Sequence, residues 1–122
     1  MERLMNFIGG EYRAPVEGRY LEKSAPTTGE TIYELPDSSE LDVVQAIQSA
    51  QKAFKDWSET KAADRSRILN RVADLIEHNL DALALAETED VGKPLDVSRS
   101  LDIPRVAWNF RFFASAILHK HE

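Results

Sequence analysis

The spacing of apolar residues changes once along the chain, and this change limits the fold more than any other feature. Up to residue 36 the apolar residues stand in short β-prone runs. From residue 39 onward they recur at intervals of three and four, which is typical of amphipathic helices. Gly92 is expected to end a helix with a positive φ, and Pro104 to kink the helix that contains it. The sequence therefore predicts a mostly helical chain, with short strands over residues 1–36 and four helices over residues 39–118.

Turn-forming residues separate the expected strands. Two glycines between β-prone runs predict a tight hairpin over residues 7–13. Further strands are expected at residues 20–23 and 31–35, with a turn at Pro26–Gly29 between them. Because so few short strands are not stable as an independent sheet, we expect them to belong to a larger structure.

Local signals also mark the helices. Ser39 and Asp42 form a capping-box pattern before the first helix, and Asn79 is the expected cap of the third. The fourth helix is expected as one kinked segment from about Pro94 to Leu118. The residues expected on the buried side of the third helix are Leu80, Leu83, Ala86 and Val91. The residues expected on the polar face of the second helix are Arg65, Arg67, Arg71, Asp74 and Glu77.

The fourth helix carries the most distinctive residues. Its aromatic residues are Trp108, Phe110, Phe112 and Phe113, for which composition alone favours a core position over a ligand-binding role. If Arg105 faced the same groove, its planar guanidinium would bind a carboxylate through two parallel hydrogen bonds. From the residues alone, a surface arginine paired with Asp102 or Glu122 is the stronger interpretation.

Composition excludes several kinds of protein. The net charge of −6 argues against non-specific nucleic-acid binding, and the lack of cysteine excludes thiolate chemistry within these residues. The five glycines form no phosphate-binding motif. His119 and His121 are two residues apart and do not face each other on a helix, so we do not expect them to share a metal. With no signal-like or membrane-spanning apolar run, we expect a cytoplasmic location and no membrane partner.

Carboxylates gather at the end of the third helix, where they oppose the helix dipole. Asp90 follows Glu87 and Glu89 directly before the glycine stop. Either a lysine such as Lys93 or a cation held together with backbone carbonyls is expected to compensate this charge.

Several of these motifs, taken in order, resemble the N-terminal portion of the aldehyde dehydrogenase superfamily, an α/β family. The matching segments are NFIGGEY from Asn6, APTTGE from Ala25, the helix ending AFKDW at Trp57, RSRILNRVADLIE from Arg65 and ETEDVGKP from Glu87. A narrower pattern, DIPR from Asp102 followed by NFRFFAS from Asn109, is similar to the branch that oxidises 2-aminomuconate or 2-hydroxymuconate semialdehyde.

The resemblance implies roles for particular residues. Arg105 would lie at the substrate tunnel and hold the substrate's carboxylate, and Leu101 would lie on the tunnel wall. Asp90 would lie at a monovalent-cation site completed by backbone carbonyls near Lys23 and Ser24. The family's cofactor is NAD(P). We expect a homo-oligomer acting on an acidic semialdehyde.

The same resemblance exposes a gap. The family's cysteine nucleophile, its general base and its NAD-binding elements lie downstream of the matched portion, so we expect no catalytic and no cofactor-binding residue here. Family chains are several times longer, which suggests a natural, proteolytic or engineered fragment that is inert alone and binds no NAD(P).

Two other hypotheses stay open: a non-catalytic helical interaction module, and a small ligand-binding protein that uses Arg105.

Overall fold

The computed structural model describes residues 2–119, and the chain divides into two compact units. The first ends at Glu59 and the second begins at Thr60. The first contains the strands and one helix, and the second is entirely helical. This order confirms the predicted class of short strands followed by helices.

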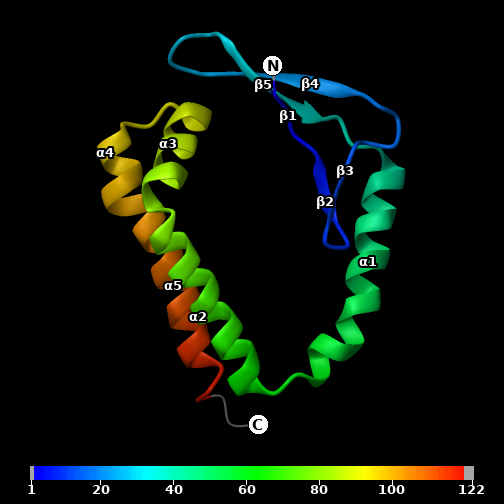
Figure 1. Cartoon of the computed structure of the whole chain (residues 1–122), viewed down its shortest axis with the longest axis vertical. Helices are drawn as coiled ribbons and strands as arrows, with labels where there is room; N and C mark the ends of the chain where they lie inside the picture. The colour runs from blue at the N-terminus through cyan, green and yellow to red at the C-terminus, as the bar shows by residue number, and fades with distance from the viewer. Residues whose placement is uncertain (1, 120–122) are drawn as a thin grey trace. The chain divides into compact units, whose positions relative to one another are not determined.

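The strands of the first unit form two small sheets (Figure 1). Its elements are β1 (Glu2–Arg3), β2 (Asn6–Ile8), β3 (Glu11–Arg13), β4 (Tyr20–Ser24), β5 (Thr31–Pro36) and α1 (Glu40–Glu59). One sheet has the order β1-β5-β4, with β1 parallel and β4 antiparallel to β5. The other is the predicted hairpin of β2 and β3.

Glycine sets the geometry of this hairpin. Gly9 and Gly10 both have positive φ, at 66° and 83°, and Ile8 pairs with Glu11 across the two-residue turn. Two consecutive positive φ values define the turn whose twist matches that of paired strands. The hairpin prediction is therefore confirmed, and so are the strands predicted at residues 20–23 and 31–35.

Hydrogen bonds from two segments meet at the start of α1. The backbone N–H of Ser39 donates to the Asp42 carboxylate at 2.8 Å, and the N–H of Val16 donates to the same group at 2.9 Å. The Ser39 hydroxyl also donates to Asp42 instead of accepting from its N–H. One half of the predicted capping box is therefore present, and Asp42 additionally fixes the loop at Val16.

The second unit packs helices through small residues. It contains α2 (Ala62–His78), α3 (Leu80–Val91), α4 (Leu95–Val97), the π-helix η1 (Ser98–Asp102) and α5 (Ile103–Ala116). In Figure 1, α2 and α5 run side by side in opposite directions. Ala73, Ala107 and Ala114 are buried, and the Ser66 hydroxyl donates to the Ala114 carbonyl at 2.7 Å. Small side chains allow the two backbones to approach closely.

The larger apolar side chains lie differently from the prediction. In α3 the buried residue is Ala84, whereas Leu83 and Val91 are 39% and 44% exposed, so the predicted buried side was wrong. In α5 the aromatic residues predicted for the core are exposed, apart from the half-buried Phe110. The spacing of apolar residues identified the helices correctly. It did not show which face of each helix packs against its neighbours within this unit.

The polar face predicted for α2 also contains an exception. Arg65 is half-buried, and its Nε is buried without a hydrogen-bond partner among the described residues. Arg67 is exposed as predicted and pairs with Asp64.

Helix ends give one confirmation and one correction. Gly92 ends α3 with φ 75° and ψ 15°, and its N–H donates to the Thr88 carbonyl, as predicted for a left-handed cap. Asn79 precedes α3, but its side-chain amide donates backward to the Leu75 carbonyl at 2.8 Å. It therefore closes the end of α2 and does not cap α3.

The predicted fourth helix is present as one continuous helical stretch, which consists of three consecutive segments, α4, η1 and α5. Helical φ and ψ continue through the junctions, and the Ile103 N–H donates to the Ser98 carbonyl five residues earlier. The ring of Pro104 would crowd the Ser100 carbonyl in a regular α-helix. The wider π-turn gives this carbonyl room, so a π-helix stands where the sequence predicted only a kink.

Candidate functional site

A hollow of about 310 Å³ opens on the surface where η1 continues into α5. It is lined by Ser100, Leu101, Pro104, Arg105 and Trp108. Leu101 and Arg105 are four residues apart, so a helical backbone places them on one face. The structure thus brings together the two residues predicted to contact substrate, both of them exposed.

Arg105 differs from most arginines of the chain in its lack of a partner. It forms no ion pair with any residue in the described range, whereas Arg111 on the same helix binds Asp74 at 2.9 Å and Glu77 at 2.5 Å. Those two carboxylates raise the pKa of Arg111, with the Glu77 hydrogen bond contributing most. Arg111 joins α5 to α2, while Arg105 is exposed and lines the hollow.

The alternative predicted for Arg105, a pair with Asp102, is wrong. Asp102 accepts a hydrogen bond from Lys93 at 2.8 Å, and this bond is the main reason that the pKa of Lys93 is raised. Lys93 also lies 3.7 Å from Glu87, which confirms that a lysine offsets the acidic end of α3. The other alternative partner, Glu122, lies outside the described residues.

Trp108 adds an aromatic wall to the hollow. Its side chain is 63% exposed, and its ring lies 5.8 Å from that of Phe112, which in turn meets Phe113 edge-on at 5.3 Å. Sequence reasoning placed Trp108 in the core and missed this position. Its spacing of three residues from Arg105 was the available signal, since such residues are neighbours on a helix.

A second, apolar hollow of about 200 Å³ lies where α5 meets α2. It is lined by Leu69, Asn109, Phe110 and Phe113. It contains no charged group, so it offers apolar contact but no means to orient an acidic ligand.

The residues predicted for a cation site are spread over both units. Lys23 and Ser24 lie in β4 of the first unit, and Asp90 lies in α3 of the second. The Lys23 ammonium donates to the Ser24 carbonyl at 3.4 Å. Within residues 2–119 no three His, Asp or Glu side chains form a metal-binding cluster, and His121 lies outside that range. The monovalent-cation site stays a prediction.

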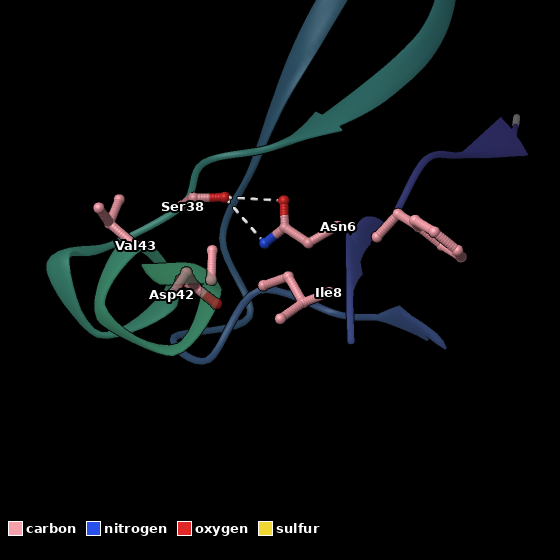
Figure 2. Close-up of a pocket in the computed structure, with 7 residues that line it drawn as sticks. Asn6, Ile8, Ser38, Asp42 and Val43 are labelled. Carbon is pink, nitrogen blue, oxygen red and sulfur yellow. Dashed lines mark hydrogen bonds between the residues drawn. The ribbon is translucent and has the colours of Figure 1, made fainter. Parts of the chain in front are cut away.

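The first unit has its own hollow of about 230 Å³, between β2 and the start of α1 (Figure 2). Asn6 and Ser38 face each other there and exchange hydrogen bonds of 2.9 and 3.0 Å. The pKa of Asp42 is lowered, first by the Ser39 backbone N–H and then by that of Val16. The Asn6–Ser38 hydrogen bonds connect the hairpin to the residues just before α1. Because the Asp42 carboxylate accepts hydrogen bonds from Ser39 and Val16, it is not available as a reactive group in this hollow.

Neither unit supplies a nucleophile of the thiolate type, because the sequence contains no cysteine. The hollow on η1 and α5 offers groups for ligand recognition instead: it is lined by Arg105, by the aliphatic Leu101 and by the aromatic Trp108. Such an arrangement fits a carboxylate attached to an apolar body. Among residues 2–119, no helix has both the length and the apolar character to span a membrane.

Comparison with known proteins finds chains of similar sequence and fold. The family model described as "Aldehyde dehydrogenase family" matches residues 12–122. A 2-aminomuconic semialdehyde dehydrogenase of Danio rerio is 46% identical over 116 residues, which are 95% of this chain and 23% of that protein. The chain therefore spans about a quarter of the length of the curated relatives it matches.

Solved structures give the same result for the fold. PnpE in complex with nicotinamide adenine dinucleotide is 35% identical with a TM-score of 0.90, over 94% of this chain and 23% of that one. Indole-3-acetaldehyde dehydrogenase in its apo form is 32% identical with a TM-score of 0.94, over 99% of this chain and 28% of that one.

Proposed function

The chain belongs to the aldehyde dehydrogenase family, and from this premise we propose that it forms the N-terminal part of an NAD(P)-dependent semialdehyde dehydrogenase. The proposed substrate is 2-aminomuconate or 2-hydroxymuconate semialdehyde, which the enzyme would oxidise to the carboxylic acid. The similarity to 2-aminomuconic semialdehyde dehydrogenases supports this branch. The chain's share in the reaction is to hold the substrate's carboxylate at Arg105, with Leu101 against its carbon skeleton.

The observation that carries the proposal is the free guanidinium in the hollow. Arg105 lines the hollow and has no ion-pair partner among the described residues, although Asp102 is three positions away in the sequence. Lys93 engages Asp102 at 2.8 Å, and no carboxylate of the described residues forms an ion pair with Arg105. Such a guanidinium is prepared to form two parallel hydrogen bonds with an incoming carboxylate.

The bond-breaking chemistry belongs to other parts of the proposed enzyme. In the family a thiolate attacks the aldehyde, and NAD(P) accepts the hydride. These residues do not fit NAD(P), since their glycines form no phosphate-binding loop, and they include no cysteine. We therefore assign to this chain substrate recognition and no step of the oxidation.

A chimeric enzyme tests this assignment. The chain would replace the aligned segment of the Danio rerio relative, whose remaining sequence supplies the rest of the enzyme. Arg105→Ala is expected to raise KM for the acidic semialdehyde roughly 10- to 150-fold, because a charge-assisted hydrogen bond is typically worth about 1.5–3 kcal/mol. Oxidation of a neutral aldehyde should change little.

Arg99→Ala is the matched control. Arg99 lies on η1 and pairs with Asp81 at 2.8 Å, so its loss removes a positive charge from the same segment without touching the hollow. It should leave the preference for the acidic substrate unchanged. Equal losses for acidic and neutral aldehydes in Arg105→Ala would contradict the carboxylate role.

A second candidate function is a non-catalytic helical interaction module. Its supporting observation is α1, whose apolar residues Ile47, Phe54 and Trp57 are 51%, 66% and 43% exposed. Exposed apolar stripes of this kind mark surfaces that contact other protein. The homo-oligomer expected for the parent enzyme stays a proposal, and sedimentation of the chimeric enzyme would test it.

A further inference from the structure

We propose that Trp108 determines which acidic substrates the hollow accepts, by selecting flat, conjugated carboxylates over saturated ones. The inference rests on the proposed function, because it takes Arg105 as the group that holds the carboxylate. It adds a residue that neither the motif pattern nor the comparisons assign to the site. The substrate class would be an unsaturated carboxylate whose double bonds lie against the indole.

The position of Trp108 is the first argument. It lines the same hollow as Arg105 and Leu101, one helical turn further along α5 than Arg105. Residues three apart on a helix are neighbours, so a ligand anchored at the guanidinium extends past the indole. Leu101 lies four residues before Arg105 and provides an aliphatic wall.

The exposure of Trp108 is the second argument. A side chain as large as tryptophan is usually well buried, yet 63% of this one is exposed, and its described ring contact is with Phe112. That neighbour is tilted by 33° to the indole. Phe112 is itself held edge-on by Phe113, so the aromatic residues support one another. The indole is therefore supported by neighbouring rings, and its exposed surface is available for contact with a ligand.

The chemistry of the two groups gives the selectivity. The guanidinium binds a carboxylate in whichever molecule carries it, so it does not distinguish a saturated from a conjugated chain. An aromatic ring gains additional stability from a second flat π-system stacked against it, beyond the apolar area that is buried. Together, the two groups favour a carboxylate joined to a planar conjugated skeleton.

Two inert six-carbon dicarboxylates of equal charge provide the probes: muconate, which is conjugated, and adipate, which is saturated. Calorimetric titration of the chimeric enzyme gives both dissociation constants without turnover. The unsubstituted chimera should bind muconate more tightly than adipate by roughly 2- to 10-fold, which is the range expected from an aromatic pair.

Variants separate the two roles. Trp108→Leu should abolish the preference for muconate and leave adipate affinity unchanged, while Trp108→Phe should retain most of the preference because it keeps a flat ring. Arg105→Ala should weaken both ligands. If Trp108→Leu keeps the preference, or weakens both ligands equally, Trp108 is not the selecting wall. If Arg105→Ala leaves both affinities unchanged, the proposed carboxylate site itself fails, whatever Trp108 does.

Discussion

Individual charged residues of the second unit fall into two groups according to their partners. Arg111 and Lys93 each bind two carboxylates and connect neighbouring helices, and such pairs raise the pKa of the cation. Arg105, one turn and a half before Arg111, has no such partner among the described residues. The difference lies in position: Arg111 faces the acidic residues of α2, whereas Arg105 lines a hollow. The two arginines thus differ in their contacts, although they are the same residue type.

The carboxylate of Asp42 gives a prediction at the same scale. Hydrogen bonds lower its folded-state pKa below the unfolded value, which is about 3.9. The folded state then binds fewer protons than the unfolded state between the two pKa values, so the stabilisation is complete above about pH 4 and is lost as the pH falls through the folded-state pKa. An acid titration followed by far-UV circular dichroism should show this loss for the first unit.

Asp42→Asn should flatten this acid-dependent loss, because an amide does not titrate. Asp81→Asn is the control, since Asp81 is exposed and binds only the surface residue Arg99 in the described contacts. It should leave most of the pH dependence intact. If Asp42→Asn follows the same acid curve as the unsubstituted chain, Asp42 is not the titrating group.

Among the elements, the π-helix η1 supplies two of the residues that line the hollow, Ser100 and Leu101. Ser98 is fully buried there, and the Thr88 hydroxyl lies 3.1 Å from its hydroxyl, which links η1 to α3. The wider turn at η1 also changes the rotation between the residues before and after it. Leu101 lies in η1 and Arg105 in α5, and both line the hollow at this junction.

The end of α3 is the element boundary that is most sensitive to substitution. Gly92→Val should lower the free energy of unfolding by more than about 1 kcal/mol, because a β-branched residue is strained at φ 75°. Denaturant unfolding measures the effect. Gly92→Asn should cost less, since asparagine tolerates the left-handed region. Equal, small losses for both variants would mean that the positive φ carries no cost.

Local signals predicted most elements, while non-local packing escaped prediction. The Gly9-Gly10 turn, the strands at β4 and β5 and the Gly92 cap all depend on residues within a few positions of each other, and all are present. Strand β1 was missed because its two residues pair in parallel with β5, about thirty positions away. The π-turn was missed because a proline pattern predicts strain at Pro104 but not how the backbone relieves it.

Of the residues that line the candidate site, two were predicted from the sequence and one important residue was not. Leu101 and Arg105 were predicted through a resemblance, and their helical spacing agrees with a shared hollow. Trp108 was assigned to a core because large aromatic residues are usually buried. The residues that pack α2 against α5 are alanines and a serine, so the large side chains were free to face outward. Sequence periodicity does not report which of two faces is closely packed.

For the molecule as a whole, the outstanding property is the amount of apolar side chain left exposed. It includes Ile47, Phe54 and Trp57 in α1, and Ile68 and Leu75 in α2. Monomeric proteins rarely expose large contiguous apolar patches. This pattern is consistent with the chain spanning 23% of the length of its Danio rerio relative, and it supports the proposal that these helices face further protein.

The isolated chain is accordingly expected to self-associate. Sedimentation equilibrium should show a mass that rises with concentration. Replacing Ile47 and Phe54 with glutamine should reduce the association, because both side chains are exposed on α1. Replacing Lys52 and Lys55 with glutamine on the same helix is the control and should not reduce it. A compact monomer at high concentration would count against exposed apolar contact surfaces.

We propose that this chain recognises the substrate of a dehydrogenase whose nucleophile lies elsewhere. The decisive measurement is NADH formation from NAD and an acidic semialdehyde, compared for the isolated chain, the chimeric enzyme and its Arg105→Ala variant. We expect no NADH from the isolated chain, since it has no cysteine, turnover by the chimera, and a strongly raised KM for Arg105→Ala. Turnover by the isolated chain, or an unchanged KM for Arg105→Ala, would contradict the proposal.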